Sequence, residues 1–60
     1  MSIWKTKDTK PNIDDEIIIE EYNDKGVLCK NIIIISSLTY KYWDDYNIKR
    51  WAFYSDIENL

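Results

Sequence analysis

Histidine is missing from this 60-residue chain, and cysteine, glycine and proline occur once each. Without histidine, neither a Ser–His nor a Cys–His nucleophile can be assembled. Cys29 alone cannot hold a zinc ion or form an intrachain disulfide. A single glycine does not make a phosphate-binding Gly-rich loop. We therefore expect a protein that is not an enzyme and that has no cofactor and no metal site.

Carboxylates are the remaining candidates for acid–base chemistry, but that chemistry needs a closed cleft that shifts their pKa values. A domain of this size has little room for such a cleft. The pair Asp44–Asp45 has the residue types of a solvated turn. It lacks the spacing and the glycine of a calcium-binding loop. The pair is therefore interpreted as a corner of the chain.

Long apolar runs are also missing, because the longest, 32–35, has four residues. A membrane-spanning helix needs about 20. The first ten residues contain no apolar segment of the signal-peptide type, so we expect a cytoplasmic protein. The net charge of −3 argues against binding to duplex nucleic acid, which depends on neutralising phosphates.

Isoleucine and aromatic side chains are abundant: eleven isoleucines and nine aromatic residues stand in 60 positions. A chain this short forms one domain, 1–60, whose stability is marginal without a disulfide or metal. A dense core or self-association must supply the stability that a disulfide or metal would otherwise give, and the isoleucine and aromatic residues can form either.

The apolar pattern predicts a mainly β fold. Four strands are expected, at 16–22, 27–36, 38–43 and 48–54, in an antiparallel meander that forms a curled sheet or a small open barrel. Residues 6–15 are expected to form an ordered loop, residues 23–26 ("NDKG") a hairpin turn, and residues 55–60 at most a short helical turn capped by Ser55. Acidic residues 14–16 would also suit the start of a helix, but three consecutive isoleucines favour a strand at 16–22.

Side-chain alternation assigns faces to the last two strands. In 38–43, Leu38, Tyr40 and Tyr42 share one face. In 48–54, the pattern places Lys49, Trp51 and Phe53 on one face and Ile48, Arg50, Ala52 and Tyr54 on the other.

The isoleucine runs do not alternate with polar residues, so both faces of those strands are apolar. One core covers only one face of an antiparallel sheet. The sequence therefore predicts a homodimer or higher oligomer; the alternative is a barrel small enough to bury both faces. The predicted interface comprises Ile17, Ile18, Ile19, Ile32, Ile33, Ile34 and Ile35. Cys29 is interpreted as a small buried side chain, with a disulfide between two copies as the alternative.

Four features together resemble a family of small phage and prophage proteins, domain of unknown function family 551. They are Trp4, Pro11, the strand "EIIIEEYNDKG" ending at Gly26, and "IKRWAF" with Trp51. The chain departs from the family after Trp51, where "WAFYSDI" replaces "WMPLPEP". The resemblance implies a small mixed-β domain carried by mobile elements and brings no established activity.

Aromatic and basic residues alternate in "YKYWDDYNIKRW", residues 40–51. Rings that stack on bases, beside cations that meet phosphates, are typical of nucleotide and single-strand binding, and Tyr, Trp and Arg are equally typical of protein interfaces. The candidate ligand- or partner-binding residues are Tyr40, Lys41, Tyr42, Trp43, Lys49, Arg50, Trp51 and Tyr54.

Two hypotheses follow from that cluster. The first is a phage-type protein that counters host defence by sequestering a small nucleotide-like ligand at an oligomer interface. The alternative is a protein inhibitor that occludes a host nuclease or defence enzyme with its aromatic face.

Overall fold

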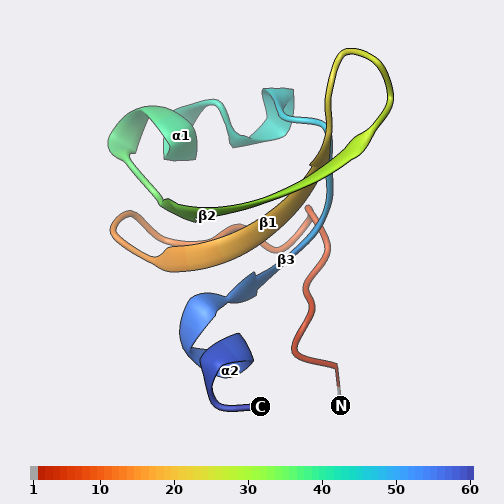
Figure 1. The fold of residues 1–60 in the computed structure, drawn as a ribbon. Coiled ribbons are helices and arrows are strands. Elements are labelled where there is room, and N and C mark those ends of the chain that lie inside the picture. Colours follow the sequence, from red (N-terminus) through yellow and green to blue (C-terminus); the bar gives the residue numbers. More distant parts are fainter. Residues whose placement is uncertain (1) are drawn as a thin grey trace.

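A three-stranded antiparallel sheet forms the centre of the molecule. The computed structural model describes residues 2–60 and is shown in Figure 1. Its elements, in chain order, are β1 (Glu16–Tyr22), β2 (Leu28–Ile34), α1 (Ser37–Lys41), the 3₁₀ turn η1 (Trp43–Asp45), β3 (Ile48–Phe53) and α2 (Tyr54–Glu58). The prediction of a mainly β fold is confirmed, and so is the assignment of residues 16–22 to a strand.

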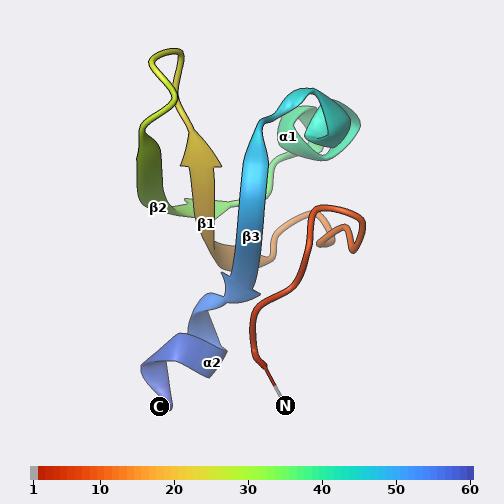
Figure 2. The ribbon, with the colours of Figure 1, turned by 90° about the vertical axis from the view of Figure 1, so that its right-hand side faces the viewer.

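The strand order is β2-β1-β3, with β1 in the middle (Figure 2). A meander pairs strands that follow one another in the sequence, whereas β3 pairs with β1 and not with the strand before it, so the meander prediction is wrong. Within residues 2–60 the sheet has three strands in place of four, and it is curved and open. β3 instead pairs with the free side of β1, and the chain reaches it through α1 and η1.

The β1–β2 hairpin follows directly from its turn residues. The Asn23 side-chain oxygen accepts hydrogen bonds from the backbone N–H groups of Lys25 (2.9 Å) and Val27 (3.0 Å). Gly26 has φ +77°, a left-handed conformation that glycine adopts without the Cβ clash of other residues. The predicted turn at 23–26 is confirmed, and β1 and β2 pair without a register shift from Glu16 to Tyr22.

Residues 37–41 form a helix, so the strand predicted at 38–43 is wrong. Ser36 is the N-cap, and its hydroxyl accepts the backbone N–H of Thr39 at 3.1 Å. No side chain of α1 is buried. A strand formed by these residues would therefore have had no face covered by the core. The local cap therefore outweighs the strand propensity of Thr39, Tyr40 and Tyr42.

A β-bulge in β3 changes which residues face the core. Glu20 pairs with Arg50 but Glu21 pairs with Ile48, which leaves Lys49 as the extra residue. An extra residue shifts the alternation by one. Ile48 therefore lies on the same face as Trp51, whereas the alternation predicted Lys49 there.

The core lies on one face of the sheet, called here the core face. It comprises Ile17, Ile19, Ile35, Trp43, Ile48 and Trp51, with Ile33, Tyr46 and Phe53 packed against it. The opposite, outer face carries Ile18, Glu20, Ile32 and Ala52. Helices α1 and α2 lie on opposite sides of the sheet in Figure 1, and α2 contacts β1 and β3.

The N-terminal segment is tied to the free edge of β3. Lys5 and Trp51 exchange two backbone hydrogen bonds of 2.7 and 2.9 Å. Residues 6–15 then form the expected loop, and Ile35 exchanges backbone hydrogen bonds with its end, at Asp14 and Asp15. At the other terminus, α2 begins after Phe53, with no side-chain cap. The predicted cap residue, Ser55, lies inside the helix because the strand leads into it without a turn.

Candidate functional site

The two tryptophans of the predicted binding cluster lie in the core. Trp43 and Trp51 are each 1% exposed, and their rings meet edge to face with centroids 6.2 Å apart. The Trp43 indole N–H donates to the carbonyl of Lys7 at 2.9 Å. That of Trp51 donates to the carbonyl of Thr9 at 2.7 Å. Their ring faces are covered by the chain itself, and their N–H groups hold the loop at 6–9 against the sheet.

The other predicted aromatic residues lie in two separate places, Tyr40 and Tyr42 in and directly after α1 and Tyr54 in α2. Tyr40 and Tyr42 are exposed, and each has a lysine ammonium over its ring: Lys10 lies 3.8 Å from the Tyr40 centroid and Lys41 lies 5.3 Å from that of Tyr42. Tyr54 is half-buried in α2, across the sheet from α1 (Figure 1). The predicted cluster is therefore not one continuous platform.

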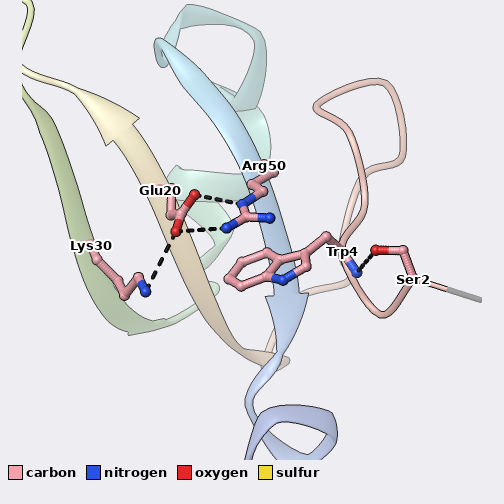
Figure 3. Close-up of polar contacts among 5 residues, drawn as sticks. All are labelled: Ser2, Trp4, Glu20, Lys30 and Arg50. Atoms are coloured by element: carbon pink, nitrogen blue, oxygen red, sulfur yellow. Dashed lines mark hydrogen bonds and ion pairs between the residues drawn. The ribbon is translucent and has the colours of Figure 1, made fainter.

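Arg50 takes part in a charged row across the outer face of the sheet (Figure 3). Its Nε donates to Glu20 at 2.6 Å, and its second terminal nitrogen donates to the other carboxylate oxygen at 3.3 Å. The Lys30 ammonium lies 3.5 Å from the same carboxylate. The register explains the row, because Glu20 pairs with Lys30 on one side and Arg50 on the other.

Glu20 is 4% exposed, and a buried carboxylate needs such partners. The hydrogen bond from Arg50 lowers the pKa of Glu20 below its usual 4.5, against the opposing effect of burial. The same hydrogen bond raises the pKa of Arg50. Both groups stay charged at neutral pH.

Trp4 completes this row and was not among the predicted site residues. Its ring lies 3.9 Å from the Arg50 guanidinium carbon, on the side of β3 that carries Glu20 (Figure 3). The two residues are far apart in the sequence, and no motif links them. Because Lys5 bridges to Trp51, the stack fixes the N-terminal segment on the sheet.

The seven isoleucines of the predicted oligomer interface have different environments. Ile17, Ile18, Ile19 and Ile35 are buried within the single chain, and Ile33 is half-buried. The apolar residues on both faces of β1 are thus covered without a second copy. Ile32 and Ile34, by contrast, are 56% and 62% exposed. Leu28, at the start of the same strand, is also exposed.

A pocket of about 320 Å³ lies beside these exposed residues. It is bounded by β1 and β2 on one side and by α1 and the residue after η1 on the other. Its lining comprises Ile19, Glu21, Ile33, Ile34, Thr39 and Tyr46. No residue pattern predicted this pocket, because part of its wall is the helix Ser37–Lys41, which was expected to be a strand.

Metal-ligating side chains do not converge in the part of the chain that the structure describes. No group of three His, Cys, Asp or Glu residues in 2–60 is placed to hold a metal ion. Cys29 is a free, half-buried thiol in β2. Across the same residues, no helix is long and apolar enough to cross a membrane.

Comparison of the chain with protein-family models, with curated proteins and with solved structures gave no match.

Proposed function

We propose that this chain is a small binding protein without catalytic chemistry of its own, and that it binds a partner protein by adding a partner strand to β2. The observation that supports the proposal is that β2 is an edge strand with exposed apolar side chains. It is an edge strand of seven residues, and Leu28, Ile32 and Ile34 on it are exposed.

The backbone of β2 has the features of a strand-addition site. The outer N–H and C=O groups of an edge strand have no strand partner, and natural proteins protect such edges with prolines, bulges or lysines. β2 contains no proline and pairs with β1 without a bulge. Its one charged residue, Lys30, pairs with Glu20, and its side chain is 62% exposed. An extended segment could therefore add to β2 along its length, as in other edge-strand recognition.

This surface favours the protein-inhibitor hypothesis over sequestration of a nucleotide-like ligand. Sequestration relied on the aromatic and basic cluster, and two of its rings, those of Trp43 and Trp51, are covered by the chain. Arg50 is already engaged by Glu20 and Trp4. The proposed partner is accordingly a protein, and a host nuclease or defence enzyme is the partner named in the protein-inhibitor hypothesis.

Selection from a library of displayed heptapeptides tests the proposal. We expect the selected peptides to be extended and apolar at alternate positions, and to shift the NMR signals of the β2 backbone amides. Replacing both Leu28→Lys and Ile32→Lys should abolish binding, because lysines on an edge oppose strand addition. Leu38→Lys is the matched control, since it replaces an equally exposed apolar residue on α1.

Two results would contradict the proposal. If binding survives the β2 double variant and is lost in Leu38→Lys, the α1 surface is the site. If the wild-type chain sediments as a dimer and the β2 double variant sediments as a monomer, a second copy occupies β2. That result would agree with the oligomer predicted from the sequence.

A further inference from the structure

The pocket beside β2 has one charged group in its lining, the carboxylate of Glu21. Among residues 2–60, Glu21 forms no ion pair. Lys30, the one basic residue of β2, lies on the outer face with Glu20, and successive residues of a strand point to opposite faces. The charge of Glu21 is therefore not neutralised by the strand on which a partner would dock.

The rest of the lining suits a long apolar stem. Ile19 and Ile33 form the floor on the core face, and Tyr46 contributes a ring. The Thr39 hydroxyl is already hydrogen-bonded to the Ser36 hydroxyl at 3.0 Å. A group that fits this pocket has a hydrocarbon chain ending in a cation, which describes the side chains of lysine and arginine.

We propose that the pocket is the specificity pocket for a lysine or arginine of the strand bound to β2. The inference rests on the proposed function. Side chains of an added strand alternate between the two faces, so every second one would lie on the core face, next to Cys29, Asn31 and Ile33.

The position opposite Asn31 is the one that leads into the pocket. Asn31 pairs with Ile19, and its neighbours on the same face are Ile33 and Cys29, the latter paired with Glu21. An added strand would lie two strand spacings, about 10 Å, from β1. Only a long side chain reaches Glu21 from there. The recognised segment thus has a central Lys or Arg, with apolar residues on either side that turn to the outer face beside Ile32.

A second copy of this chain fits the pocket less well. Its β2 would present Cys29, Asn31 and Ile33 on the core face, and none of them carries a positive charge. Two copies with a net charge of −3 each also repel one another, whereas a basic partner is attracted. Charge complementarity therefore selects a basic segment of another protein.

Three synthetic heptapeptides test the pocket: Val-Thr-Val-Xaa-Val-Thr-Val, acetylated and amidated, with Arg, Gln or Glu as Xaa. Binding is measured by NMR titration of the full chain. We expect the Arg peptide to bind about tenfold more tightly than the Gln peptide, because a charge-assisted hydrogen bond to Glu21 is lost. The Glu peptide should bind most weakly of the three.

The variant Glu21→Gln should bind the Arg and Gln peptides equally, and Glu16→Gln, at the far end of the same strand, should leave the preference intact. If all three peptides bind wild-type protein equally and shift the β2 amides, strand addition stands and the pocket inference is overturned. If none binds up to millimolar concentration, the proposed function fails and the inference fails with it.

Discussion

Replacement of Trp43 tests whether this ring is core or binding surface. The side chain is 1% exposed, packs edge to face on Trp51 and donates to the Lys7 carbonyl. Removing a buried tryptophan side chain costs roughly 3–5 kcal/mol of unfolding free energy, and the lost hydrogen bond adds about 1 kcal/mol. Domains are stable by about 0.05–0.15 kcal/mol per residue, which is roughly 3–9 kcal/mol for 60 residues. The variant Trp43→Ala should therefore lose about 4–6 kcal/mol, roughly half or more of the free energy of unfolding expected for this chain.

Trp43→Phe is a milder form of the same change. It keeps a ring in the core but loses the N–H and part of the packing volume, which should cost about 1–2 kcal/mol. For a domain of this size each kcal/mol lowers the melting temperature by roughly 4–8 °C. The melting temperature of Trp43→Phe should thus fall by roughly 5–15 °C.

Urea denaturation measures the free energies of unfolding and a thermal melt measures the melting temperature, each followed by far-UV circular dichroism. Tyr42→Ala is the matched control, because it removes an exposed ring from the neighbouring position and should change the free energy of unfolding by no more than about 0.5 kcal/mol. The core assignment is refuted if Trp43→Ala unfolds cooperatively at the same urea concentration as Tyr42→Ala.

Three further changes probe the hairpin turn, the helix cap and the buried ion pair. Gly26→Ala should destabilise the chain by about 1–2 kcal/mol, although no atom lies within 4 Å of the new Cβ; an unchanged thermal melt would show that the turn relaxes. Ser36→Ala should cost about 1 kcal/mol by removing the N-cap, and Ser36→Asp, which keeps an acceptor, should restore it. For Glu20, Arg50 lowers the folded-state pKa below 4.5. Its stabilisation is therefore complete above about pH 4.5 and is lost as the pH falls through the lowered value. Wild-type stability should decline more steeply than that of Glu20→Gln between pH 5 and about pH 2, and parallel curves would contradict the ion pair.

Residue patterns predicted correctly those elements that depend on interactions between residues close together in the sequence. The isoleucine run at 17–19 and the turn residues Asn23 and Gly26 specify the first hairpin, and its strands lie where expected. The helix at Ser37–Lys41 was missed because its residues favour strands, whereas one serine hydroxyl placed before them starts a helix. A capping residue is a weak signal in a sequence, and here it decided the element.

The neighbours of each strand could not be predicted in the same way. Alternation states which face a side chain occupies but not which strand lies beside it, so the β2-β1-β3 order was not foreseen. The bulge at Lys49 shifted the faces by one residue. Burial of Ile18 was attributed to a second copy, whereas Ile18 is 7% exposed in the single chain. Contacts such as that of Trp4 with Arg50 join distant segments and leave no periodic pattern.

The Lys5–Trp51 bridge has a consequence for how the chain is made. The two residues are 46 positions apart in the sequence (5 and 51), so the bridge cannot form until residue 51 has left the ribosome. Contacts between such distant residues also form late, because the loop between them must be ordered first. Until then the central strand exposes isoleucines on both faces, which is the condition in which nascent chains aggregate. A product cut short before residue 51 would lack the partner of Lys5 and most of β3, and it is thus expected to have no native state to reach.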